Sequence, residues 1–100
     1  MKTYWVVRSK IINKVNYKKY KDLVPDIIKK YNGKILPRGG DFKVLKGTEQ
    51  FHRFGIIEFP SLEDGERFWS SKEYQKDSSF RKNGYGLVDL ILVDSGDVTK

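Results

Sequence analysis

Three segments of the chain are apolar at nearly every position and lack the alternation of a strand with one wet face. They are Tyr4–Val7, Phe54–Phe59 and Leu87–Val93. Antiparallel strands with one solvent-facing side alternate apolar and polar residues. We therefore expect both faces of these strands to be covered. Helices of the same chain are able to cover one face of such a sheet, and a second copy of the protein is the simplest cover for the other.

The segment from Val15 to Asn32 has the three-and-four spacing of an amphipathic helix. Its apolar positions are Tyr17, Tyr20, Val24, Ile27, Ile28 and Tyr31. Pro25 lies inside this pattern and is expected to bend or break the helix. Gly33 follows the last apolar position and is expected to end the helix in the left-handed backbone conformation.

The remaining segments complete a strand–helix–strand–strand–helix–strand order. The predicted strands are residues 3–11, 34–38, 52–59 and 86–94. Pro37 cannot donate to a ladder, so the second strand is expected at a sheet edge, and Phe42–Leu45 is expected to return as a small hairpin arm. Ser61 and Ser71 are the expected N-caps of two short helices. This order predicts an α+β fold of the ferredoxin-like βαββαβ type, with a four-stranded antiparallel sheet in the order 4-1-3-2.

Composition fits a single globular domain over residues 1–100, with 38% hydrophobic and 33% charged residues. The chain contains no cysteine, which excludes disulfides and thiolate metal sites. It has no secretory signal pattern and no run near the ~20 apolar residues of a membrane-spanning helix. We therefore expect a cytoplasmic protein without membrane contact. His52 is the only histidine and lacks partners for a metal site, so neither a metal nor a cofactor is expected.

The formal net charge is +7, which raises the question of an anionic partner. Eight lysines lie on or beside the predicted helix, at positions 10, 14, 18, 19, 21, 29, 30 and 34. A nucleic-acid footprint usually mixes arginines and aromatics with its lysines. Here the tyrosines fall on the apolar stripe instead, which favours a solvated basic face.

Several short motifs occur in a specific order and spacing along the chain. They are Tyr4-Trp5-Val6-Val7-Arg8, Tyr17 with Tyr20, Tyr31-Asn32-Gly33-Lys34, Arg38-Gly39-Gly40, Ile57-Glu58-Phe59-Pro60-Ser61, Ser71 with Glu73, Tyr74 and Gln75, and Arg81. Together they resemble the domain of unknown function 1330 family, within the dimeric α+β barrel superfamily, from about residue 3 to 94. Lys72 departs from this pattern, since the family usually has proline there.

The resemblance implies a compact ferredoxin-like subunit that pairs sheet to sheet with a second copy as a homodimer. Related families of the superfamily include small cofactor-free monooxygenases, isomerases and haem-handling enzymes, whereas this family has no general assigned reaction. A monooxygenase- or isomerase-like activity without a cofactor is therefore the enzymatic version of the expectation.

Glu58 is the candidate catalytic residue, because it shares a strand face with apolar Phe54 and Ile56. A buried carboxyl has a raised pKa and is suited to act as a general acid or base. The alternative is a structural acid paired with Arg8, Arg38 or Arg81.

The candidate ligand-binding residues are Tyr4, Arg38, Trp69, Tyr74 and Arg81, in a pocket expected between the sheet and the helices. Tyr74 and Arg81 are two helical turns apart and share a face. With Arg38 they would fix a small anionic molecule through guanidinium and hydroxyl donors, while Tyr4 and Trp69 would form walls. The alternative is a helix docked on the sheet by an Arg–carboxylate pair.

Two competing classes remain. Residues 52–59 resemble the strand-3 signature of RNA-recognition motifs, with Phe54, Gly55, Ile57 and Phe59 in matching positions. Arg53 stands where glycine is expected, and Ile56 replaces a base-stacking aromatic, so nucleic acid is the weaker alternative. The other class is a structural dimer without a ligand.

Overall fold

A computed structural model describes residues 1–77 and 86–96. The elements in chain order are β1 (Thr3–Ile11), α1 (Lys14–Lys30), β2 (Lys34–Arg38), β3 (Arg53–Phe59), α2 (Leu62–Ser70), α3 (Lys72–Asp77) and β4 (Gly86–Asp94). The strands form one antiparallel sheet in the order β2-β3-β1-β4. The predicted ferredoxin-like fold is confirmed, with Pro37 on an edge strand.

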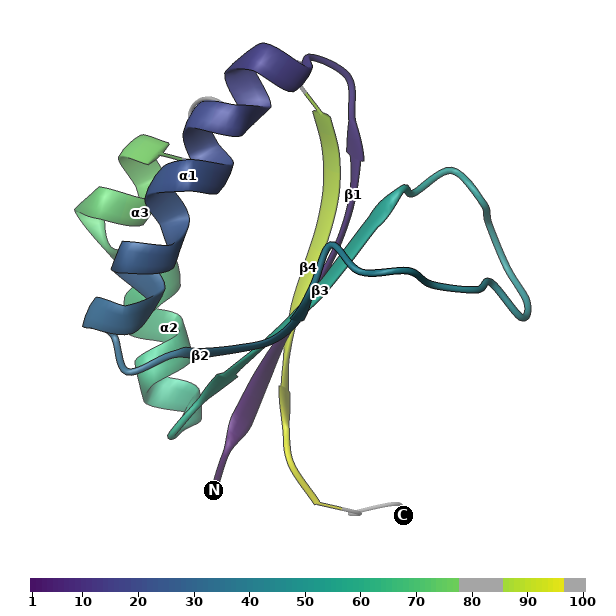
Figure 1. The fold of residues 1–100 in the computed structure, drawn as a ribbon. Helices are drawn as coiled ribbons and strands as arrows, with labels where there is room; N and C mark the ends of the chain where they lie inside the picture. The colour runs from purple at the N-terminus through teal and green to yellow at the C-terminus, as the bar shows by residue number, and fades with distance from the viewer. Residues whose placement is uncertain (78–85, 97–100) are drawn as a thin grey trace.

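The described helices all lie against one face of the sheet (Figure 1). None of them covers the other face, which we call the open face. Alternation along β1 separates the two sides, since Thr3, Trp5 and Ser9 are buried whereas Tyr4 and Val6 are only half-buried. The core under the helices is built largely from aromatic and branched side chains: Trp5, Val24, Ile28, Ile57, Phe59, Phe68 and Tyr74.

Helix α1 runs without a break through Pro25 and ends in a Schellman motif. The amide of Gly33 donates to the carbonyl of Ile28 (2.8 Å), and that of Asn32 donates to the carbonyl of Lys29 (3.1 Å). The left-handed residue is Asn32, with a φ of 65°, so the expectation that Gly33 takes this conformation is wrong. Gly33 is needed for space instead, because a Cβ there would lie 2.6 Å from Ile28 Cγ2.

The predicted hairpin arm at Phe42–Leu45 is wrong, because residues 39–52 contain no strand. This segment joins β2 to β3 and extends away from the sheet on the side opposite the helices (Figure 1). Phe42 packs on Phe54 with ring centroids 4.5 Å apart. Phe42 therefore packs onto the sheet, whereas Leu45 is 87% exposed, and the two residues do not pair as strands.

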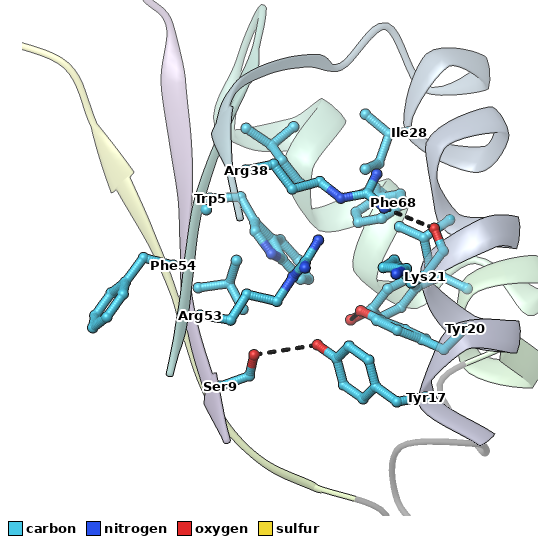
Figure 2. Close-up of a pocket in the computed structure, with 15 residues that line it drawn as sticks. Trp5, Ser9, Tyr17, Tyr20, Lys21, Ile28, Arg38, Arg53, Phe54 and Phe68 are labelled. Atoms are coloured by element: carbon cyan, nitrogen blue, oxygen red, sulfur yellow. Dashed lines mark hydrogen bonds between the residues drawn. The ribbon is translucent and has the colours of Figure 1, made fainter. Parts of the chain in front are cut away.

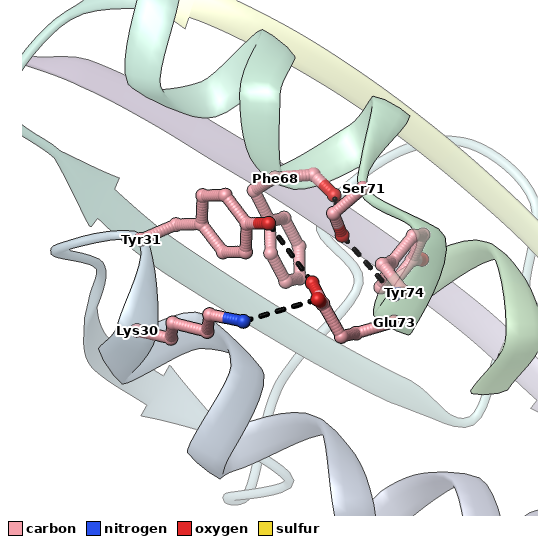
Figure 3. Close-up of polar contacts among 6 residues, drawn as sticks. All are labelled: Lys30, Tyr31, Phe68, Ser71, Glu73 and Tyr74. Carbon is pink, nitrogen blue, oxygen red and sulfur yellow. Dashed lines mark hydrogen bonds and ion pairs between the residues drawn. The ribbon is translucent and has the colours of Figure 1, made fainter.

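Both predicted N-caps are confirmed. Ser61 Oγ accepts a hydrogen bond from the amide of Asp64 (3.2 Å) at the start of α2. Ser71 Oγ accepts one from the amide of Tyr74 (3.1 Å) and donates to the carbonyl of Phe68 (2.8 Å). Ser71 thus joins the end of α2 to the start of α3 and fixes the position of Tyr74 (Figure 3).

Glu73 ties α3 to the end of α1. Its carboxylate accepts hydrogen bonds from Lys30 Nζ (3.0 Å) and from the Tyr31 hydroxyl (2.9 Å), as Figure 3 shows. The bond from Lys30, and next the bond from Tyr31, lower the pKa of Glu73 below its ordinary value of 4.5. The same pair raises the pKa of Lys30. Glu73 therefore holds α3, and with it Tyr74, against α1.

We expect this contact to stabilise the fold above about pH 4.5 and to be lost at more acidic pH. A carboxyl with a depressed folded-state pKa contributes stability above its unfolded pKa and loses it as pH falls through the folded pKa. Glu73→Gln should therefore unfold more easily than the wild type at pH 7, and the difference should vanish on acidification. Urea titrations across this pH range measure it. Glu66→Gln, an exposed position on α2, is the matched control and should follow the wild type throughout.

Candidate functional site

A pocket of about 60 Å³ lies between the sheet and α1 (Figure 2). Its walls come from β1, α1, β2, β3, α2 and α3. The lining residues are Trp5, Val7, Ser9, Tyr17, Tyr20, Lys21, Val24, Ile28, Arg38, Arg53, Phe54, Gly55, Ile57, Phe68 and Tyr74. Phe54 contributes its backbone side, since its ring points away to the open face (Figure 2). This is the predicted location of a pocket, between sheet and helices.

Two arginines extend from the sheet towards α1 in this pocket: Arg38 at the end of β2 and Arg53 at the start of β3 (Figure 2). Arg53 is paired with Ser9 in the sheet, and Arg38 with Gly55. Positions 53, 55, 57 and 59 share the helix-facing side of β3. Strand alternation therefore directs Arg53 to the same side as the buried Ile57 and Phe59.

Pro25 explains where Arg38 is anchored. Proline has no N–H, so the carbonyl four residues earlier, that of Lys21, has no helical donor. Arg38 Nη2 donates to this carbonyl at 2.9 Å, as the dashed line in Figure 2 shows. The guanidinium has five N–H groups, so the remaining ones stay available to other acceptors.

Hydroxyl groups line the pocket beside the arginines. The Tyr17 hydroxyl donates to Ser9 Oγ at 3.2 Å, and the hydroxyls of Tyr20 and Tyr74 lie 3.0 Å apart. Tyr17 and Tyr20 come from α1 and Tyr74 from α3. The pocket thus combines cationic and hydroxyl donors with an apolar floor that includes Trp5, Ile28 and Phe68 among its members.

The electrostatic balance of the pocket is positive. Burial lowers the pKa of Arg38 first, and the charge of Arg53 lowers it further, although both effects leave a guanidinium charged at neutral pH. Tyr17, Tyr20 and Asp22 act in the opposite direction. None of the described residues that line the pocket is an aspartate or a glutamate.

The structure brings together only part of the predicted site. Arg38 and Tyr74 line the pocket, and Arg81 lies outside the described residues. Trp69 does not line it. The residue is 41% exposed, and its ring centroid is 5.8 Å from those of both Trp5 and Tyr74. It supports the pocket wall instead of forming it.

Tyr4 and Glu58 do not line this pocket, and the expectation that they would is wrong. The two residues pair with each other across β1 and β3, on the open face. Glu58 forms an ion pair with Lys2 at 3.3 Å, rather than with an arginine. The sheet separates the candidate catalytic carboxylate from Arg38 and Tyr74, so these three groups cannot act on one small ligand in the pocket.

Sequence reasoning missed Arg53 and assigned Tyr17 and Tyr20 only to the core. The period of two along β3 would have found Arg53, since it falls in phase with Gly55 and Ile57. The tyrosines carry no such signal, because a tyrosine on a helical stripe looks the same whether its hydroxyl is buried in the core or turned to a pocket.

Within the described ranges, no group of three or more histidine, cysteine, aspartate or glutamate side chains is arranged to hold a metal ion. Among the same residues, no helix has the length and apolar character needed to cross a membrane.

The fold and the pocket together define a small ferredoxin-like α+β protein. Its cavity under α1 has cationic and hydroxyl groups on one part of the wall and apolar side chains on the rest. Residues 2–95 match the family model described as Domain of unknown function (DUF1330), and the chain belongs to this family. No curated protein matches the sequence.

Solved structures with the same fold come from several bacteria. RPA0582, a protein of unknown function from Rhodopseudomonas palustris, has a TM-score of 0.78 and 15% identity, covering 96% of this chain and 83% of that one. A dimeric ferredoxin-like protein of unknown function from Bacteroides fragilis has a TM-score of 0.65 and 12% identity, covering 94% and 96%. SnoaB, a cofactor-independent oxygenase from Streptomyces nogalater, has a TM-score of 0.58 and 6% identity, covering 97% and 95%. At such identities the likeness shows the fold alone.

Proposed function

We propose that this protein binds a small organic molecule in the pocket between the sheet and α1. The observation that carries the proposal is the composition of the pocket wall, where apolar and aromatic side chains surround a few convergent polar groups. Binding sites for small molecules have this character. A cavity of about 60 Å³ is also well above the roughly 10–15 Å³ that a single water needs.

An enzymatic version of the proposal is an oxygenase- or isomerase-like reaction without a cofactor. SnoaB, which shares the fold, is described as a cofactor-independent oxygenase. Such a reaction in this pocket would use the hydroxyls of Tyr20 and Tyr74, because no described lining residue is a carboxylate or a histidine. Histidine and carboxylate side chains are the usual general bases in enzymes. The lining residues therefore favour binding over proton abstraction.

Filling the pocket is expected to abolish ligand binding. Val24 on α1 lines the pocket and is 7% exposed, so Val24→Phe places a ring where the ligand would lie. Compounds that raise the melting temperature of the wild type by mass action should leave that of Val24→Phe unchanged. Overpacking is expected to lower the stability of the variant by about 1–3 kcal/mol, so binding is compared at a temperature where both proteins are folded.

Val15→Phe is the matched control for this experiment. Val15 is on the same helix but is 74% exposed, so the added ring points into solvent and binding should equal that of the wild type. Binding that survives in Val24→Phe would place the ligand elsewhere and refute the pocket as the binding site.

We also propose that the open face pairs two copies of the chain as a homodimer. Large apolar side chains on this face are substantially exposed, namely Leu36, Leu87, Ile91 and Val93. Ile91 and Val93 adjoin each other on one strand face, and an exposed apolar patch of this kind usually marks an interaction site. A second copy is the favoured occupant because proteins of this fold from Bacteroides fragilis and a Jannaschia species are described as dimeric. Tyr4 and Glu58 would then lie at the interface rather than at a ligand.

A further inference from the structure

Arg38 and Arg53 differ from the other arginines whose ion pairs the structure describes. Arg8 has Asp89 at 2.8 Å, and Arg67 has Glu63 at 2.5 Å. Arg38 and Arg53 have no carboxylate within 4.0 Å among residues 1–77 and 86–96. Two partly buried like charges with no carboxylate in direct contact repel each other. A pair of arginines in this arrangement is expected at a site where a bound anionic ligand neutralises their charge.

The backbone beside Arg53 leaves room for its guanidinium. Gly39 follows β2 with a φ of 71°, and a Cβ there would lie 3.0 Å from Arg53 Nη1 and 3.2 Å from its Cζ. The guanidinium of Arg53 thus lies against bare backbone. Arg38 is fixed separately by the carbonyl of Lys21. Arg38 is therefore anchored before a ligand binds, which reduces the ordering required on binding, and the glycine leaves Arg53 the space to lie beside the pocket.

The pocket floor next to these charges is apolar. Val24 and Ile28 come from α1, Trp5 and Ile57 from the sheet, and Phe68 from α2. A ligand that satisfies both parts carries a negative group at one end and hydrocarbon at the other. The size of the pocket limits the alkyl end to about three carbons, since about 60 Å³ is less than half of the roughly 150 Å³ of a cavity that encloses the six carbons of benzene.

We propose that the ligand is a short-chain aliphatic carboxylate, with its carboxylate between Arg38 and Arg53 and its alkyl end on Trp5, Ile57 and Phe68. This inference rests on the proposed binding function and narrows it to one chemical class. Guanidinium groups suit carboxylates because their parallel N–H donors match the two carboxylate oxygens. The planar carboxylate determines the specificity of binding, and the alkyl end packs on the apolar residues of the pocket.

The probes are sodium butyrate, its uncharged isostere butyramide, and inorganic phosphate, each titrated into the wild type with backbone amide NMR shifts as readout. Butyrate is expected to give saturable shifts in residues that line the pocket. Butyramide is expected to bind at least ten-fold more weakly, because it cannot neutralise the guanidinium pair. Phosphate is expected to bind more weakly than butyrate, because its charged oxygens on every side cannot occupy the apolar floor.

Arg53→Met is expected to weaken butyrate binding at least ten-fold, and Arg38→Met similarly. Arg67→Met is the matched control, since Arg67 is on the outside of α2 in an exposed ion pair, and it should bind butyrate as the wild type does. Arg38 also bonds to the helix backbone, so Arg53→Met decides the question if Arg38→Met is unfolded by circular dichroism.

The outcomes separate this inference from the function on which it rests. Equal binding of butyrate and butyramide, or unchanged butyrate binding by Arg53→Met, would overturn the carboxylate assignment and leave the pocket as a binding site. Phosphate binding as tight as butyrate would overturn it too, in favour of a plain oxyanion site. Butyrate binding that persists in Val24→Phe would instead refute the pocket itself.

Discussion

Replacing Phe68 with alanine is expected to lower the free energy of unfolding by about 3–5 kcal/mol. Phe68 is 0% exposed and lies at the centre of the aromatic core. Its ring centroid is 4.6 Å from that of Tyr74, 5.1 Å from Trp5 and 5.4 Å from Phe59. These rings come from β1, β3, α2 and α3. Truncation would therefore leave a cavity at the point where the helices meet the sheet.

Urea unfolding followed by tryptophan fluorescence measures this loss. Phe42→Ala is the control, because Phe42 is 47% exposed in the segment between β2 and β3. Its contact with Phe54 is expected to be worth about 1 kcal/mol. Equal losses in the two variants would mean that the stability of the domain does not depend on the Phe68 cluster.

The element order was predictable because each element carries its own local signal. Pro37 identifies an edge strand through its missing donor, and Ser61 and Ser71 identify helix starts through their hydroxyl acceptors. These signals depend on a few neighbouring residues, so no long-range information is needed. Because the strands are apolar on both faces, the sheet needs a helix layer on one face and a further partner on the other, and few arrangements of the elements provide this.

The residues that line the pocket were harder to predict, because they depend on which face of the sheet the helices cover. A strand that is apolar on both sides does not reveal which side the helices cover. Glu58 was correctly grouped with Phe54 and Ile56, but that group lies on the open face, whereas Arg53, Gly55 and Ile57 face the helices. Neighbouring residues of a strand point to opposite faces of the sheet, so an error of one position moves a side chain from the pocket to the open face.

Arg38 shows how a local rule and a long-range contact combine. The sequence identifies Pro25 as a defect in the helix, and the rule of four residues identifies Lys21 as the carbonyl without a donor. It does not identify which side chain would satisfy that carbonyl. The edge strand β2 passes α1 at this point, and Arg38 donates to it. The carbonyl that Pro25 leaves without a helical donor thus anchors one of the two arginines of the pocket.

Introducing a lysine on the open face is expected to break the proposed dimer. Ile91 is 59% exposed and pairs with Val6 on β1, away from the helices. In a sheet-to-sheet dimer its side chain would be buried. An unpaired charge there costs about 3–5 kcal/mol, which weakens association by roughly a hundredfold or more.

Light scattering at micromolar concentration measures the result. The wild type is expected to have about twice the chain mass of 11.7 kDa, and Ile91→Lys is expected to have the mass of a single chain. Val15→Lys adds the same charge on the exposed side of α1 and should remain dimeric. A folded wild type at the single-chain mass would refute the pairing, and the apolar side chains of the open face would then need another partner. Circular dichroism of Ile91→Lys decides whether the fold survives, and a folded single chain means that the sheet face holds the two copies together.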